Sequence, residues 1–315
     1  MEVFSATLNQ TAFLLSFILL GYILSRFHFV PENAQTSLSK LENYLFVPAL
    51  VLGTFIENFT PEKLFPAWEL FLGSLALALV VILLAMACVH FCSKDSYVRK
   101  IYLYGLSFSN FGFMGNAVVS ALFPEIFMEY LIFTLPLWIL IYLWGVPSLL
   151  MTDSVQKPSI GQRMRNFLNP MFVCMLLGIL IGFFSVRVPE FLSSVISSAS
   201  ACMSPVAMLL TGMTIARYDL RKILANKGIY LVSGLRLLAF PALFLAAMLV
   251  FPFPETFAIC AVCSLAMPLG LNTIIIPSAY GKDTSIASGM ALVSHALSCI
   301  TIPLIFMVLD FVCRV

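Results

Sequence analysis

Charged residues are scarce in this sequence. Lys and Arg account for 17 of the 315 residues and Asp and Glu for 15, so that 10% of the chain is charged, whereas soluble domains carry roughly 25%. Hydrophobic residues make up 61%. This balance excludes a water-soluble globular protein. The formal net charge is only +2 and no dense basic block occurs, which argues against nucleic-acid binding.

Motifs of enzymes and of ATP-driven transporters are also missing. The sequence contains no HExxH, no paired carboxylates inside an apolar run and no nucleotide-binding loop. Cys260 and Cys263 form a CxxC without a second pair or a histidine cluster, so we expect them to pack as small residues. We therefore predict that the protein is not an enzyme and that it has no catalytic residues, no cofactor and no metal site.

Apolar runs long enough to cross a bilayer are abundant. A helix needs about 20 apolar residues to span the hydrocarbon. The N-terminus lacks a positively charged stretch, so the first run is expected to be a retained helix and not a cleaved signal peptide. We predict ten spans, near residues 8–26, 38–57, 67–91, 101–123, 126–150, 169–185, 191–216, 229–251, 256–280 and 285–310.

Cationic residues are distributed unevenly between the predicted loops. With the N-terminus outside, 13 of the 17 fall in inward loops, among them Lys157, Arg163 and Arg165. Arg236 lies inside span eight, where we expect it to extend towards the membrane surface. The positive-inside rule therefore predicts that both termini are outside. The three outward cations are Lys63, Arg187 and Arg314.

The two halves of the sequence share features at nearly one offset. This indicates duplication of a five-helix unit, with the first repeat at residues 1–155 and the second at 156–315. An odd number of spans inserts the second copy upside down, and inverted repeats are typical of secondary transporters. The matching pairs are Pro48 and Pro205, Gly112 and Gly270, and Pro147 and Pro303, at offsets of 157, 158 and 156.

Spans four and nine contain helix-breaking residues at corresponding places. Pro268 lacks an N–H and Gly270 adds backbone freedom, so we predict that span nine breaks near the bilayer midplane. The freed backbone groups must meet protein, water or a ligand. Half-helix N-termini attract anions, and neither break contains Asp, Glu, Lys or Arg. The alternative is that these residues only allow close helix packing. The predicted substrate-binding residues are Asn110, Gly112, Gly115, Asn116, Pro268, Gly270, Asn272 and Thr273.

Other polar residues inside the spans have two interpretations each. His295 in span ten is a possible coupling residue, because histidine titrates near physiological pH; alternatively it is neutral and bonded to a neighbouring helix. Asn43, Thr54 and Thr211 either line the site or form interhelical hydrogen bonds. No motif requires sodium, so proton, sodium or no ion coupling stays open.

The stretch Asn-Phe-Gly-Phe-Met-Gly that starts at Asn110 resembles the span-four motif of the auxin efflux carrier family. The resemblance covers essentially the whole chain, and the lack of a long central loop resembles the prokaryotic members. Asn116 stands where many members carry proline, and His295 stands where a small hydroxyl residue is common. Further matching pieces are Ala266-Met267-Pro268, Ala279-Tyr280-Gly281-Lys282-Asp283, Ser294, Leu297-Ser298 and Thr301-Ile302-Pro303.

The resemblance implies an all-α fold like that of bile acid sodium symporters, with ten transmembrane helices in two inverted five-helix repeats. Spans one, two, six and seven would form a scaffold that dimerises. Spans three to five and eight to ten would form a mobile transport domain, in which spans four and nine cross at their breaks. The family moves organic anions, including auxins, malate and malonate, and an elevator-type movement is the expected mechanism.

The function predicted from the sequence is thus a secondary carrier of small organic anions. We expect a multi-pass protein of the cytoplasmic (inner) membrane, in contact with lipid. Alternatives are a sensor that kept the carrier fold without flux, a channel, and a membrane-embedded enzyme, which the missing motifs disfavour.

Overall fold

The computed structural model describes residues 2–31, 33–151 and 168–313 of the chain. Within these residues the regular structure is helical, apart from one isolated β-bridge. The predicted boundary between residues 155 and 156 lies outside the described part, as do Lys157, Arg163, Arg165 and Arg314.

Several predicted spans are built from more than one consecutive helix. The helices before residue 152 are α1 (Glu2–Arg26), α2 (Ala34–Leu41), η1 (Glu42–Phe46), α3 (Val47–Asn58), α4 (Pro61–Leu64), α5 (Trp68–Cys92), α6 (Ser96–Ser107), η2 (Phe111–Gly115), α7 (Asn116–Leu122), η3 (Pro124–Ile126), α8 (Phe127–Leu140) and η4 (Ile141–Leu150). The later helices are α10 (Pro170–Phe183), α11 (Glu190–Ala216), α12 (Leu220–Leu224), α13 (Lys227–Gly234), η5 (Leu235–Ala239), α14 (Phe240–Met248), α15 (Glu255–Leu265), α16 (Asn272–Ala279) and α17 (Ser285–Cys313).

Five continuous helical stretches in the described residues are long and apolar enough to cross a membrane. They confirm the predicted all-α membrane class, and their positions agree with predicted spans three, five, seven, eight and ten. The stretches are Trp68–Cys92, Pro124–Leu150, Glu190–Ala216, Lys227–Met248 and Ser285–Val312. Shorter apolar helices occupy Thr11–Arg26, Phe111–Leu122, Pro170–Phe183 and Glu255–Leu265.

Side-chain caps explain where several helices begin. The Oδ1 atom of Asp95 accepts a hydrogen bond from the Val98 N–H at 2.8 Å, and α6 starts directly after Asp95. The Oδ1 atom of Asn169 likewise accepts from the Phe172 N–H at 3.0 Å before α10. Each cap satisfies a backbone donor that has no partner inside the helix.

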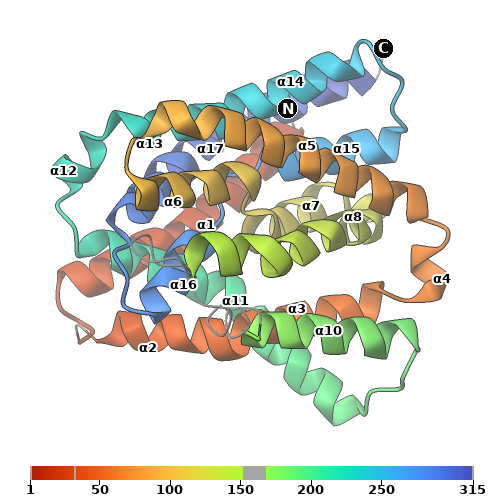
Figure 1. Ribbon diagram of the computed structural model, residues 1–315, viewed down its shortest axis with the longest axis horizontal. Coiled ribbons are helices and arrows are strands. Elements are labelled where there is room, and N and C mark those ends of the chain that lie inside the picture. Colours follow the sequence, from red (N-terminus) through yellow and green to blue (C-terminus); the bar gives the residue numbers. More distant parts are fainter. Residues whose placement is uncertain (1, 32, 152–167, 314–315) are drawn as a thin grey trace.

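Glycines allow the helices of the predicted scaffold to approach closely. A Cβ atom on Gly212 of α11 would collide with the backbone of Ile18 in α1, and one on Gly21 would collide with the backbone of Leu209. A Cβ on Gly178 of α10 would lie 2.7 Å from the Cβ of Phe55 in α3. Small residues at such contacts are typical of membrane helices. In Figure 1, α10 runs beside α3 along one edge of the molecule, and α5 and α14 lie along the opposite edge.

Candidate functional site: a crossing of two interrupted helices

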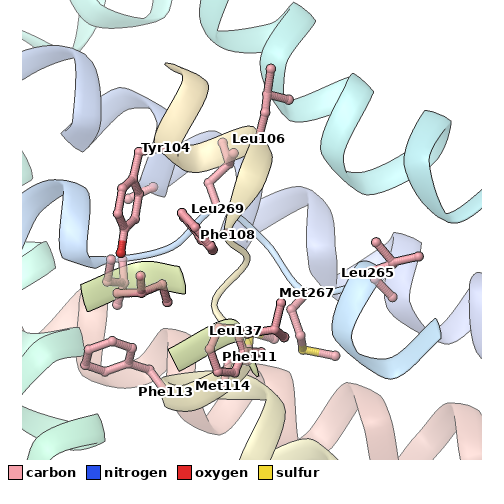
Figure 2. Packing of buried hydrophobic residues seen from close by; sticks show 14 of the residues in the cluster. Tyr104, Leu106, Phe108, Phe111, Phe113, Met114, Leu137, Leu265, Met267 and Leu269 are labelled. Carbon is pink, nitrogen blue, oxygen red and sulfur yellow. The ribbon is translucent and has the colours of Figure 1, made fainter. Parts of the chain in front are cut away.

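Two extended segments meet in the interior of the molecule, where predicted spans four and nine are interrupted. Residues 108–110 follow α6 and residues 266–271 follow α15. They pair antiparallel through the bridge between Ser109 and Leu269. Figure 2 shows the two segments crossing among buried side chains. The breaks predicted in both spans are therefore present, and they are in contact with each other.

Backbone hydrogen bonds hold the two crossing segments together. The Asn110 N–H donates to the Pro268 carbonyl at 2.7 Å, and the Gly270 N–H donates to the Phe108 carbonyl at 3.2 Å. A Cβ on Gly270 would lie 2.9 Å from the Phe108 oxygen and 3.3 Å from the Ser109 oxygen. Residue 270 must therefore be glycine if the segments are to approach this closely.

Arg236 holds the C-terminal ends of both interrupted helices. Its Nη1 donates to the Leu106 carbonyl in α6 at 3.0 Å, and its Nη2 donates to the Ser264 carbonyl in α15 at 3.0 Å. Its Nε lies 3.4 Å from the carbonyl oxygen of Met267. The residue is 2% exposed, so the expectation that Arg236 extends to the membrane surface is wrong. Carbonyls left free at two helix ends provide a better partner than the distant interface.

A new helix begins close after each crossing segment. Helix η2 begins directly after Asn110, and α16 begins at Asn272. Half-helix N-termini carry partial positive charge and free N–H groups. Because Arg236 occupies the carbonyl ends and neither crossing segment contains an acidic residue, the crossing has an excess of positive charge.

Asn110 is held by His295 of α17. The Nδ2 atom of Asn110 lies 2.9 Å from the Nε2 of His295, and the Nδ1 of His295 lies 2.8 Å from the Ala291 carbonyl oxygen. A carbonyl only accepts, so Nδ1 carries the ring proton and Nε2 accepts from the asparagine amide. Both side chains are buried. The contact joins the predicted coupling residue to a predicted binding residue.

Asn272 is held in a comparable way by Tyr104 of α6. The Nδ2 of Asn272 donates to the Tyr104 hydroxyl at 2.9 Å. Thr273, the next residue, donates its hydroxyl to the Gly270 carbonyl at 2.8 Å. All of these side chains are buried. The Nδ2 group of each asparagine is thus held by a hydrogen bond to a neighbouring helix.

The amide oxygens of both asparagines have no hydrogen-bond partner within the part of the chain that the structure describes. The Oδ1 atoms of Asn110 and Asn272 are buried and unpaired. An unsatisfied buried acceptor costs about 1–3 kcal/mol, and each Nδ2 retains a second hydrogen for another acceptor. Each amide can therefore bond a ligand group or a water that both accepts and donates.

The break of span four lies at residues 108–110 and not at the glycines that follow. Gly112 and Gly115 lie within η2, which begins directly after the extended segment. A Cβ on Gly112 would collide with the Trp138 ring, and one on Gly115 would collide with the Tyr130 hydroxyl. These glycines therefore allow α8 to pack against η2, which is the packing role that the sequence left open. Asn116 begins α7, is half-buried, and has an unpaired Oδ1.

The three predicted lining residues lie on α3, η1 and α11. Asn43 is 1% exposed with an unpaired Oδ1, and its helix η1 packs against α11 and α16. The Thr211 hydroxyl donates to the Ala207 carbonyl of its own helix at 2.7 Å. Thr54 is buried in α3. Asn43 is thus the one of the three with an unsatisfied polar atom next to a crossing helix.

The comparisons with known proteins identify the family of the chain. The model of a family described as "Membrane transport protein" matches residues 6–306. The chain belongs to this family. The match confirms the expected relationship to the auxin efflux carriers and identifies a multi-pass integral membrane protein. A relative named "Putative malonate transporter", from Rhizobium meliloti (strain 1021), is 24% identical over 292 residues, which cover 90% of each chain.

Sequence reasoning missed two polar residues of this membrane transport protein. Tyr104 lies in the apolar face of α6, and nothing in its neighbourhood indicated that it bonds Asn272. Glu42 is fully buried with both carboxylate oxygens unpaired. The sequence alone could have indicated Glu42, because an acidic residue within a predicted span is a functional candidate.

A large cavity lies apart from the crossing. It has a volume of about 940 Å³ and lies between α5, α14 and α15. Its wall is mainly apolar, with Phe240, Phe244 and Phe257 among the lining residues. Neither Asn110 nor Asn272 lines it. The cavity is thus apart from the buried asparagines of the crossing.

Proposed function

We propose that this protein is a secondary carrier of small organic anions, which bind where the two interrupted helices cross. A helix begins close after each of the two crossing segments, and the buried cation Arg236 bonds the carbonyl ends of the helices that precede them. That local excess of positive charge carries the proposal, because an anion is the ligand that it stabilises. Carboxylates, dicarboxylates such as malate and malonate, and auxin-like acids are the candidate substrates.

The binding groups in this proposal are neutral. Asn110 and Asn272 supply amide hydrogens, and the N-termini of η2 and α16 supply backbone N–H groups. Thr273, Pro268 and Gly270 shape the second crossing segment, whereas Gly112, Gly115 and Asn116 belong to the helix after the first. The name of the malonate-transporter relative supports a dicarboxylate of this size.

The proposed mechanism is an elevator-type alternating access. We infer ten spans in two inverted repeats, residues 1–155 and 156–315, with both termini outside the cytoplasmic membrane. Helices α1, α2–α3, α10 and α11 would form the scaffold of a homodimer, and the other long helices would carry the anion. The close contact of α1 with α11 supports a rigid scaffold. A proton or sodium ion would supply the driving gradient.

Counterflow in liposomes tests the proposal. Purified protein is reconstituted into liposomes loaded with unlabelled malonate. Labelled malonate, malate or indole-3-acetate is added outside, and its uptake into the liposomes is measured. We expect uptake of at least one of these, loss of that uptake in Asn110→Ala and Asn272→Ala, and unchanged thermal unfolding of both variants. A sensor without flux would bind a carboxylate but show no counterflow. Normal uptake by both variants would refute the proposed site.

A further inference from the structure

Glu42 is a buried carboxyl group whose oxygens have no hydrogen-bond partner among residues 2–31, 33–151 and 168–313. It is 0% exposed, and neither Oε1 nor Oε2 has a hydrogen bond. It begins η1, a π-helical turn between α2 and α3. π-helical turns are frequent at functional sites. Since a bare carboxylate without a partner is strongly unfavourable in an apolar interior, this group needs a ligand of its own.

Glu42 ends a polar stripe along one face of α2 and η1. Gln35, Ser39 and Glu42 are spaced by four and three residues, which places them on one helix face, and all three are buried. The amide nitrogen of Gln35 donates to the Thr214 hydroxyl at 2.6 Å, and Arg217 Nη1 donates to the Gln35 Oε1 at 2.8 Å. The stripe thus leads from the end of α11 to the buried carboxyl.

The same stripe contacts the helix that starts at the crossing. The Ser39 hydroxyl donates to the Ile275 carbonyl of α16 at 2.6 Å, and η1 itself packs against α16. Helix α16 begins with Asn272, one of the two proposed anion-binding amides. Any movement of α16 along η1 would change the surroundings of Glu42 and of the anion together.

The charged groups near Glu42 leave it without a counter-ion. Helix η1 packs against α2, α3, α10, α11 and α16. Lys40 is exposed on another face of α2, and the Arg217 guanidinium bonds Gln35. Helix α16 contains no titratable residue. The other titratable groups on these elements are Tyr44, Glu57, Cys174, Glu190 and Cys202, and none of them hydrogen-bonds the Glu42 carboxyl.

We propose that Glu42 is a proton-binding site that couples a proton to the movement of the anion. The carboxyl holds the proton while η1 is packed against α16, and releases it to water as H⁺ when the movement of α16 opens the polar stripe. The coupling of the proton to the anion rests on the proposed carrier function. The protonation of Glu42 does not depend on that function.

Infrared spectroscopy tests the protonated carboxyl without any transported substrate. The C=O band of protonated carboxylic acids is recorded for the protein in lipid at neutral pH, in sodium-free and in sodium-containing buffer. We expect a band that is lost in Glu42→Gln and kept in Glu57→Gln, a matched change at an exposed carboxylate of α3. A spectrum that is the same in wild type and Glu42→Gln overturns the proposal. A band that disappears when sodium is added assigns the site to sodium instead.

Transport in liposomes tests the coupling. Malonate uptake is measured with and without an inward proton gradient. The acceleration by the gradient should be at least tenfold larger in wild type and in Glu57→Gln than in Glu42→Gln. Counterflow, which needs no gradient, should remain in Glu42→Gln. Equal acceleration in all three proteins overturns the coupling. If wild type moves no carboxylate, the carrier function fails while the infrared result still decides whether Glu42 holds a proton.

Discussion

The guanidinium of Arg236 donates to the carbonyl oxygen of Ser264 at 3.0 Å, at the point where α15 ends. The same side chain bonds the end of α6, so one buried cation serves two interrupted helices. In secondary transporters, half-helix C-terminal ends and unwound carbonyls commonly coordinate the coupling cation. Here a covalently attached cation bonds the carbonyls at these helix ends.

Replacing Arg236 by alanine should destabilise the protein strongly. The change leaves the Leu106 carbonyl without its donor and removes one of the two donors to the Ser264 carbonyl, which keeps the Ser109 hydroxyl at 2.7 Å. An unsatisfied buried group costs about 1–3 kcal/mol. We expect the free energy of unfolding to fall by at least about 2 kcal/mol, measured by thermal or denaturant unfolding in detergent. Arg187→Ala, at an exposed arginine, is the control and should change stability by less than about 0.5 kcal/mol. Equal stability of both variants would contradict the role assigned to Arg236.

The break in span nine could be predicted from the sequence because it depends on two neighbouring residues. Pro268 and Gly270 cannot continue a helix easily, so the break in span nine follows from local chemistry. The glycines of span four are no such guide, because Gly112 and Gly115 are helical and the chain leaves the helix at residues 108–110. Tertiary hydrogen bonds to the partner segment set that boundary, and they are not visible in a local pattern.

The partners of polar residues were harder to predict than the helices. Arg236 was expected at the membrane surface because it lies near the cytoplasmic end of span eight, from where a long side chain can reach the interface. Its true acceptors lie 28 and 130 residues away along the chain. The Tyr104–Asn272 contact likewise joins residues 168 positions apart. Hydropathy and spacing describe single helices, whereas these bonds depend on how the helices pack.

Adding a methyl group to Gly112 should destabilise the packing of η2 on α8. A Cβ there would collide with the Trp138 ring, and overpacking of a well-packed interior typically costs about 1–3 kcal/mol. Gly234→Ala is the matched control, because a Cβ at Gly234 meets nothing within 4 Å. We expect Gly112→Ala to lower the unfolding temperature and Gly234→Ala to leave it unchanged or to raise it slightly. A similar shift in both variants would count against the contact with Trp138.

Removing the Tyr104 hydroxyl should weaken anion binding while the fold is kept. In Tyr104→Phe the Asn272 amide loses the acceptor that positions it, at a cost of about 1–3 kcal/mol, which corresponds to an increase in Kd of roughly 5- to 150-fold. Binding of the carboxylate found by counterflow is measured by thermal shift or calorimetry. Tyr44→Phe, at an exposed tyrosine in η1, is the control. Wild-type affinity in Tyr104→Phe would exclude Asn272 positioning as a determinant of binding.

His295 should act by holding Asn110, and its variants separate this role from proton coupling. His295→Phe removes the acceptor of the Asn110 amide and should reduce counterflow about tenfold or more. His295→Gln offers a side-chain oxygen in place of Nε2, so it should restore much of the activity while being unable to titrate. The pH profile of uptake then decides between two coupling residues. If Glu42 binds the proton, His295→Gln keeps the wild-type profile and Glu42→Gln loses it, whereas the reverse result would assign coupling to His295.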